Sequence, residues 1–271
     1  YLMDKIQDAI AKARATRAGN MGHGMPHGIV PSPHNNALWT DLPAHAPSMR
    51  RLARNRVVAA DAGRRAMDFD VIRTRLLQQM QANNWKRVAI TSPTASCGKS
   101  TMVMNLAFSL ARLGDHRTIV AEMDLRKPSL AKSLGLPGEN RFADVLAGRG
   151  RFEENAARIG ENLIFATNNA PVPASAELLQ SAGTAQTLDE ISSQYDPTVM
   201  IFDMPPMMTG DDTMAFLNRV DCVLLVAAAE QSTIKQIDVC ERDIASQTNV
   251  MGVILNKCRY TDPDNAYGYY E

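Results

Sequence analysis

Residues 92–101 read Ser-Pro-Thr-Ala-Ser-Cys-Gly-Lys-Ser-Thr and stand between a short apolar run and a long amphipathic pattern. A strand that turns tightly into the start of a helix directs several backbone N–H groups at one point, where the helix dipole also favours an anion. Gly98 lets the backbone approach a phosphate, Lys99 can reach the β- and γ-phosphates, and the Ser100 hydroxyl can bind Mg²⁺. The stretch therefore predicts a phosphate-binding loop.

The rest of the loop supplies weaker candidates for phosphate contact. These are Thr94, Ala95, Ser96, Cys97 and, as a second hydroxyl, Thr101. The complete motif has a glycine where Pro93 stands here, so the match is to the Gly-Lys-Ser end alone. The alternative interpretation is a Ser/Gly turn followed by an ordinary helix with a surface lysine.

The composition is that of a globular protein. Of 271 residues, 45% are hydrophobic, which is enough to bury one large core with appendages. Basic and acidic residues number 29 each, so no overall field attracts nucleic acid, and we expect no nucleic-acid partner. The four cysteines show no C-x-x-C spacing. We therefore expect the protein to lie in the reducing cytoplasm. No apolar run approaches the ~18 residues of a membrane span.

The sequence divides into four segments. Residues 1–18 have apolar positions at helical spacing and predict a short amphipathic helix. Residues 19–65 are rich in Gly, Pro and His, end in an arginine-rich run, and predict a flexible linker. Its histidines lack a scaffold to fix a metal ion, and its arginines suit either a solvated helix face or an acidic or phosphate partner. Residues 66–258 form the main domain and 259–271 a tail.

Apolar runs alternate with helical patterns throughout the main domain. The apolar runs are 87–91, 118–123, 163–166, 199–202, 222–227 and 251–255, and the helical patterns are 66–82, 102–113, 176–195 and 232–246. Continuous apolar strands separated by helices indicate a mostly parallel sheet covered on both faces, the doubly wound α/β class. Ligands of such folds bind beyond the carboxyl ends of the strands.

Three acidic residues and an amide lie at these strand ends. Glu122 and Asp124 lie two residues apart at the end of one strand, so their carboxylates can converge near the phosphate-binding loop. Asp203 ends another strand and suits Mg²⁺, directly or through water. Asn256 ends the last strand, where its amide could contact a nucleotide base. The alternative for each acid is a helix cap or a turn residue.

Four tyrosines gather in the tail, among Gly, Pro, Asp and Asn and without large apolar partners. They are Tyr260, Tyr267, Tyr269 and Tyr270. Without such partners they are expected to be exposed. They are phosphate acceptors, each gaining about −1.5 to −2 charge on modification, or else the tail packs on a partner or is merely an aromatic end.

Residues 66–271 resemble the bacterial tyrosine autokinases of capsule and exopolysaccharide export. The resemblance rests on the SPTASCGKST loop, the strand ends EMDLRKP and IFDMPP, the LNK of the last strand and the tyrosine-rich tail. It implies a P-loop NTPase fold of the deviant-Walker type and a kinase that uses ATP and Mg²⁺ to phosphorylate the tail of a neighbouring identical subunit. The DNA-partitioning ATPases share the first four features, but they have an extra lysine where Thr94 stands and lack the tail.

The resemblance also implies catalytic roles. Lys99 would neutralise the β- and γ-phosphates of ATP, with Arg126 adding positive charge. Ser100 and Asp203 would hold Mg²⁺. Asp124 would bind the metal or take part in catalysis. Glu122 would be the base for the tyrosine hydroxyl.

Partners follow from the same family. Its oligomers form without phosphate and come apart as phosphate accumulates, and a membrane chain-length regulator activates the kinase. For this chain the resemblance implies a cytoplasmic homo-oligomer, recruited to the inner face of the membrane by a separate regulator. Four positions depart from the family: Glu122 replaces an aspartate, Ser96 a glycine, Cys97 an acidic residue, and Asp70 an arginine of the oligomerisation helix.

Two other functions stay open. One is an ATPase switch of the partitioning or division-site type, whose dimerisation depends on nucleotide. The other is an adaptor that binds ATP without turnover in a polysaccharide export complex. The tyrosine tail favours the kinase, whereas Thr94 and the lack of another basic DNA-binding patch count against partitioning.

Overall fold

The computed structural model describes residues 34–136, 138 and 140–258. The predicted N-terminal helix, the first part of the predicted linker and the tail with its four tyrosines lie outside the described residues. Among the helices of the described ranges, none combines the length and apolar character needed to span a bilayer.

The described part of the chain builds one seven-stranded sheet in the order β3-β4-β2-β5-β1-β6-β7. The strands are β1 Arg87–Thr91, β2 Thr118–Glu122, β3 Ala156–Ile159, β4 Leu163–Ala166, β5 Val199–Asp203, β6 Cys222–Ala228 and β7 Asn249–Asn256. Neighbouring strands run parallel except β3 and β4, which are antiparallel. β2, β5 and β6 are buried along their whole length, which explains their continuously apolar sequences.

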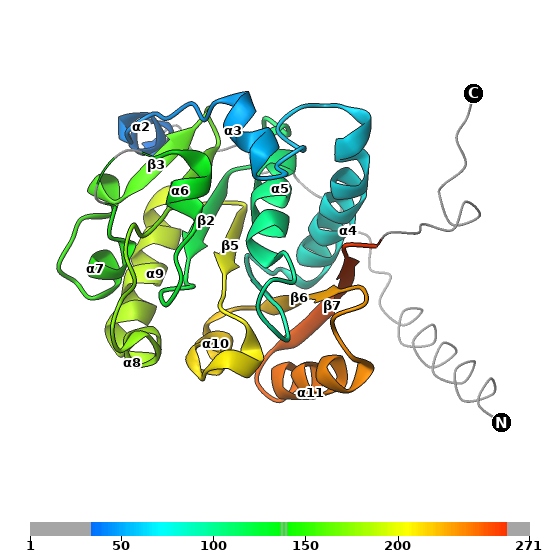
Figure 1. Ribbon diagram of the computed structural model, residues 1–271. Coiled ribbons are helices and arrows are strands. Elements are labelled where there is room, and N and C mark those ends of the chain that lie inside the picture. The colour runs from blue at the N-terminus through cyan, green and yellow to red at the C-terminus, as the bar shows by residue number, and fades with distance from the viewer. Residues whose placement is uncertain (1–33, 137, 139, 259–271) are drawn as a thin grey trace, which may run out of the picture. The chain divides into compact units, whose positions relative to one another are not determined.

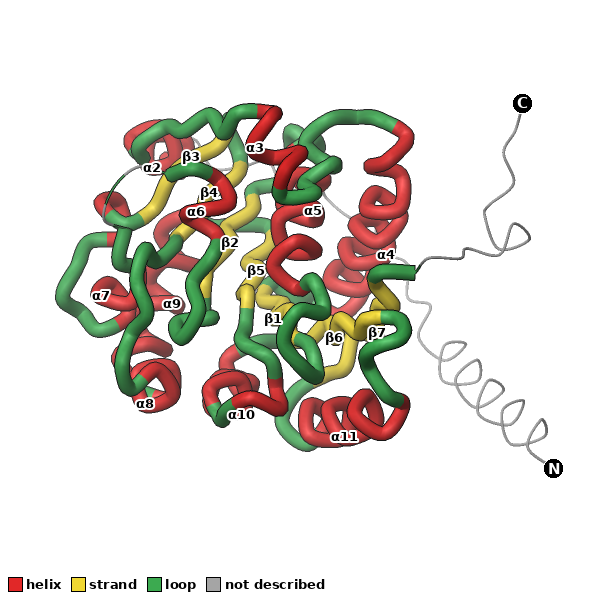
Figure 2. The backbone as a smooth tube through the Cα atoms, in the orientation of Figure 1, coloured by secondary structure: helices red, strands yellow, loops and turns green. Residues whose placement is uncertain are grey.

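Helices cover both faces of this sheet, as Figure 2 shows. They are α2 His34–Asp41, α3 Met49–Arg54, α4 Met67–Asn83, α5 Lys99–Ala111, α6 Leu130–Leu134, α7 Phe142–Leu146, α8 Ser175–Gln180, α9 Ala182–Tyr195, α10 Asp212–Phe216 and α11 Ile234–Ala245. Residues of α3, α4 and α5 belong to the core of one face, and those of α2, α9, α10 and α11 to the core of the other (Figure 1). The doubly wound α/β architecture is confirmed.

The differences from the sequence prediction include the short helices α6, α7 and α10, an edge strand and a divided helix. The antiparallel edge strand β3 was not predicted, because Ala-Ala-Arg-Ile is too short and mixed to show a strand pattern. The predicted helix 176–195 is two helices, α8 and α9. Ser181 separates them and caps α9, since its hydroxyl accepts the N–H of Thr184 at 3.1 Å.

The predicted linker is wrong for residues 34–65, which belong to the folded domain. α2 buries Trp39, whose indole N–H donates to the carbonyl of Tyr195 on α9 at 2.9 Å. α3 buries Leu52 in the core of the opposite face. Pro43 and Pro47 interrupt the segment, and its buried residues pack on distant elements. It therefore shows no helical or strand periodicity.

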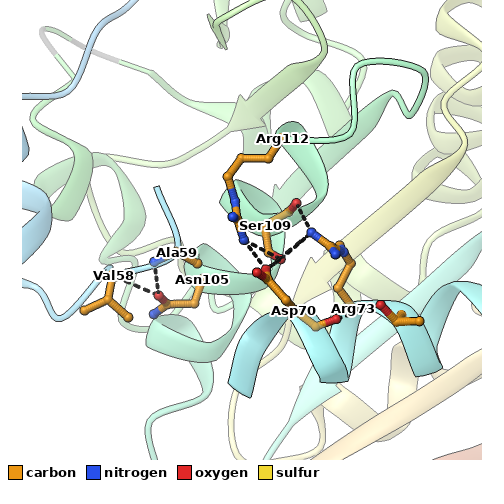
Figure 3. A network of polar contacts seen from close by, with 8 residues as sticks. Val58, Ala59, Asp70, Arg73, Asn105, Ser109 and Arg112 are labelled. Atoms are coloured by element: carbon orange, nitrogen blue, oxygen red, sulfur yellow. Dashed lines mark hydrogen bonds and ion pairs between the residues drawn. The ribbon is translucent and has the colours of Figure 1, made fainter. Parts of the chain in front are cut away.

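The chain after α3 is fastened to α5 by the fully buried Asn105, shown in Figure 3. Its side-chain carbonyl accepts the N–H groups of Val58 at 2.8 Å and Ala59 at 3.0 Å. Its amide donates to the carbonyl of Arg56 at 3.0 Å. One side chain thus satisfies three backbone groups of a segment without regular structure.

Asp70 joins α4 to α5 in the polar cluster of Figure 3. Its carboxylate accepts hydrogen bonds from Ser109 and Arg112 and lies 3.3 Å from Arg73. Burial raises the pKa of Asp70, but the bonds from Arg112 and Ser109 and the two positive charges hold it below its usual value. Asp70, which replaces an arginine of the resembled family, therefore makes its contacts within this subunit.

Candidate nucleotide-binding and catalytic site

The predicted phosphate-binding loop connects β1 to α5 and turns at Gly98. Gly98 has a φ of 94°, and a Cβ added there would lie 2.3 Å from the side-chain nitrogen of Asn256. Both facts favour glycine. The segment after β5 supports the start of the loop, because the N–H of Met207 donates to the carbonyl of Ser92 at 2.9 Å. The predicted order of strand, loop and helix is confirmed.

Ser96 lies in the exposed part of the loop with a φ of 65°. This left-handed conformation costs a non-glycine residue roughly 1 kcal/mol. The strain arises at the position where the resembled kinases have glycine.

Ser96→Gly is expected to raise the free energy of unfolding by about 0.5–1 kcal/mol. Glycine would remove the strain that Ser96 carries in the folded loop at a φ of 65°. Denaturant unfolding measures the change. Ser96→Ala keeps the strain and should unfold like the wild type, so an equal gain from both variants would contradict the strain argument.

Lys99, Ser100 and Thr101 form the first turn of α5. The Lys99 ammonium lies 2.7 Å from a carboxylate oxygen of Asp124, and the two side chains are 12% and 10% exposed. Burial lowers the pKa of Lys99, but the charges of Asp203 and Asp124 outweigh it and raise the pKa. The lysine is therefore a fixed positive charge at the strand ends.

Asp203, the last residue of β5, is fully buried. Burial raises its pKa to about 6, against the lowering effects of the Lys99 charge and the Ser100 hydroxyl. Neither carboxylate oxygen has a hydrogen-bond partner in the described chain, so the hydroxyl is close without meeting hydrogen-bond geometry. Such a buried carboxylate is costly unless an ion binds it.

Mg²⁺ fits this arrangement. The described residues contain no group of three or more His, Cys, Asp or Glu side chains suited to a metal. Mg²⁺, however, is usually held by one or two carboxylates together with substrate phosphates. The unpartnered oxygens of Asp203, with Asp124 and Ser100 nearby, supply such a donor set.

Glu122 does not join Asp124 as a free carboxylate pair, which corrects the prediction. β2 ends at Glu122, so Asp124 leaves the strand alternation. The Glu122 carboxylate accepts three backbone N–H groups, from Ser129 at 2.6 Å, Leu130 at 2.7 Å and Asn168 at 2.8 Å. Burial raises its pKa to about 7, although these three bonds lower it. Its side chain anchors the loops after β2 and β4.

Asn256 and Cys97 are occupied within the chain. The amide of Asn256 donates to the carbonyl of Cys97 at 2.9 Å and fastens the loop to the end of β7. The Cys97 sulfur is buried, 3.6 Å from the hydroxyl of Thr94 and 3.7 Å from that of Ser232. Ala95 is exposed. The place of Asn256 beside the loop agrees with the prediction, whereas its contact with a base stays a prediction.

One polar group beyond the strand ends has no signal in the sequence. Nε of Arg126 lies 2.7 Å from Oδ2 of Asp212 on α10, and the other oxygen of Asp212 accepts the hydroxyl of Ser175 on α8. Asp212 and Ser175 are buried. Sequence reasoning missed Asp212 and Ser175, because the three residues follow three different strands and share no spacing.

Comparison with known proteins gives a family model and several relatives. The family model described as ParA, NUBPL iron-transfer P-loop NTPase, matches residues 84–269. The putative tyrosine-protein kinase CapB of Staphylococcus aureus is 26% identical over 204 residues, which are 74% of this chain and 88% of CapB. The putative tyrosine-protein kinase EpsB of Ralstonia solanacearum is 31% identical over 201 residues, which are 73% of this chain but 26% of EpsB.

The fold recurs in solved structures. The kinase domain of the Escherichia coli tyrosine kinase ETK matches with a TM-score of 0.69 and 24% identity, over 84% of this chain and 88% of that domain. At this identity the likeness concerns the fold alone. The similarity to EpsB covers about a quarter of that protein, so it does not extend to the activity or partners of the whole of EpsB.

Proposed function

The chain belongs to the ParA family of P-loop NTPases, with bacterial tyrosine-protein kinases among its relatives, and we propose that it is an ATP-dependent tyrosine autokinase. Its acceptors would be Tyr260, Tyr267, Tyr269 and Tyr270 in the tail of a neighbouring copy. The observation that carries this proposal is the cluster of Lys99, Asp124 and the unpartnered Asp203 at the start of α5. These charges lie where the loop would hold the phosphates of ATP.

Each side chain of the cluster has a separate task. Lys99 supplies positive charge to the β- and γ-phosphates. Asp203 and Ser100 would hold Mg²⁺, which would neutralise charge on the phosphate oxygens, and Asp124 is left for the proton transfer. Phosphoryl transfer needs little covalent chemistry from the protein, so positioning and charge account for most of the rate.

In the transfer, the phenol oxygen of tyrosine forms a bond to the γ-phosphorus of ATP. The bond between that phosphorus and the bridging oxygen breaks, and its electron pair stays with ADP. The phenol proton passes to a carboxylate oxygen. Asp124 is 7% exposed, whereas Glu122 and Asp203 have no exposed surface. We therefore assign the proton to Asp124 in place of Glu122.

The family resemblance supports a wider setting for this activity. The kinase would regulate the polymerisation and export of a capsule or exopolysaccharide from the cytoplasm, under a membrane chain-length regulator. It would act between copies of a homo-oligomer. Because Asp70 is bonded to Arg112 and Ser109 within the subunit, the contact between copies should differ from that of the family.

Phosphate mapping by mass spectrometry after incubation with Mg·ATP tests the kinase. The wild type should carry phosphate on Tyr267, Tyr269 or Tyr270, and Lys99→Ala should lose about a hundredfold or more of the rate. Lys235, an exposed lysine of α11, gives the matched control Lys235→Ala, which should react like the wild type. A tagged Lys99→Ala acceptor that gains phosphate from wild-type protein would establish transfer between copies.

An ATPase switch is the second candidate, and the family match favours it. ATP hydrolysis with unmodified tyrosines would overturn the kinase and establish the switch. Binding of ATP with neither hydrolysis nor phosphorylation would favour the adaptor.

A further inference from the structure

A groove of about 350 Å³ lies beside the candidate site. Its walls come from the segments after β2, β4 and β5, which are adjacent strands of the sheet. Arg126 lines it two residues after Asp124, the carboxylate that pairs with Lys99. The groove therefore adjoins the segment that carries Asp124.

The other side of the phosphate-binding loop is closed by β6 and β7. Asn256 at the end of β7 and Ser232 after β6 both contact Cys97. Since β1 lies between β5 and β6, the groove and these contacts lie on opposite sides of the loop. Transfer in line requires the acceptor to approach the γ-phosphate from the side opposite ADP. If the adenine base of ATP lies toward Asn256, the groove lies on the side from which the acceptor tyrosine approaches.

Arg126 pairs with two acidic residues at the groove, Asp211 and Asp212. Its Nε is bound to Asp212, whose side chain is 2% exposed, while the side chain of Arg126 is 48% exposed. Gly210 packs against the guanidinium, since a Cβ there would lie 3.1 Å from Cζ of Arg126. A guanidinium that is paired with acids and about half exposed can stack on an aromatic ring.

The remaining groove residues are small or acidic. Val172, Ala174 and Ala176 leave room for a ring. Asp211 and Glu177 are exposed and together form the acidic rim of the groove. Asp211 lies 3.5 Å from Arg126 and its side chain is 80% exposed. The acidic rim would repel an acceptor with acidic neighbours.

The tyrosines of the tail differ in their neighbours. Tyr267 stands between Ala266 and Gly268, which are small and uncharged. Tyr270 is followed directly by Glu271. The first environment suits a narrow groove with an acidic rim, and the second does not.

We propose that this groove is the acceptor subsite of the kinase, in which Arg126 stacks on the phenol ring and the acidic rim selects Tyr267 before Tyr270. The inference rests on the proposed kinase function and adds the order in which the tail is modified. Each phosphate brings about −1.5 to −2 charge. The rim therefore also disfavours a second acceptor next to one already phosphorylated.

Synthetic tail peptides test the selection. Two peptides of residues 259–271 keep only Tyr267 or only Tyr270, with phenylalanine at the other tyrosines. Wild-type protein should use the Tyr267 peptide with a kcat/KM about tenfold higher. The double variant Asp211→Asn, Glu177→Gln should reduce this ratio to about threefold or less. With wild-type protein, Glu271→Gln in the Tyr270 peptide should likewise reduce the ratio of the two kcat/KM values to about threefold or less.

Variants of the arginine test the stacking. Arg126→Lys keeps the charge but loses the planar group, and it should raise the KM of the Tyr267 peptide about tenfold while leaving the Kd of ATP within about twofold. Lys127→Ala, at the exposed neighbouring position, is the matched control and should change neither constant.

A binding assay separates this inference from the kinase function. A labelled tail peptide with all four tyrosines changed to phenylalanine is titrated in the presence of a non-hydrolysable ATP analogue. Weaker binding by Arg126→Lys without phosphorylation of any peptide would overturn the kinase and leave the groove as a binding site for the tail. Equal phosphorylation of both peptides, with KM and peptide binding unchanged by Arg126→Lys, would overturn the subsite and leave the kinase standing.

Discussion

Asp203→Asn is expected to stabilise the protein and at the same time to reduce phosphorylation about a hundredfold or more. The Asp203 charge is buried, and neither of its oxygens has a hydrogen-bond partner in the described chain. An amide of the same size removes that charge, and Lys99 keeps its 2.7 Å contact with Asp124. The free energy of unfolding at neutral pH should rise by about 1–2 kcal/mol. Denaturant unfolding and phosphate mapping on the same variant measure the two effects.

The gain from Asp203→Asn should depend on pH with a defined sign. Burial raises the folded-state pKa of Asp203 to about 6 from 3.8, so the folded protein binds this proton more tightly than the unfolded chain. Its stabilising contribution is complete below pH 3.8 and is lost as the pH rises through about 6. The advantage of the variant should therefore be absent near pH 3.8 and complete by neutral pH.

Asp124→Asn is the matched control, because it changes a neighbouring carboxylate of the same cluster. It weakens the ion pair with Lys99, so it should lower phosphorylation without raising stability. A loss of stability in Asp203→Asn at neutral pH would show that the buried charge is better compensated than its contacts indicate.

The parts of the site that the sequence predicts correctly are those with local signals. The phosphate-binding loop is continuous with β1 and α5, and Asp203 and Asn256 end apolar runs. Parallel strands place their carboxyl ends at one edge, so the meeting of Lys99, Asp124 and Asp203 follows from the pattern once the sheet is recognised.

The parts that were missed depend on contacts between distant segments. The orientation of Glu122 is set by N–H groups of Ser129, Leu130 and Asn168, which α6 and the segment after β4 bring to it. No spacing in β2 reveals these donors. The pairing of Arg126 with Asp212 likewise joins segments after two different strands. Such features require the assembled tertiary structure.

Trp39→Ala should lower the free energy of unfolding by about 3–5 kcal/mol, the usual cost of truncating a large buried aromatic residue. Trp39 lies in the segment that the sequence predicts as a linker, yet it is 1% exposed. Its ring meets that of Tyr195 edge-on at 6.3 Å between centroids, and its indole N–H donates to the Tyr195 carbonyl. The alanine variant would lose the buried area, the ring contact and the hydrogen bond together. Denaturant unfolding followed by circular dichroism measures the loss without using tryptophan fluorescence.

Leu38→Ala provides the control for Trp39→Ala, because Leu38 is on the same helix but only partly buried against the core. Its loss should be about 1 kcal/mol, in proportion to the smaller apolar area removed. If residues 34–65 were a linker, both variants would unfold like the wild type. The expected difference between the two therefore measures how firmly α2 is packed on α9. Because Trp39 contacts α9 and not the phosphate-binding loop, folded Trp39→Ala protein should still bind ATP with wild-type affinity.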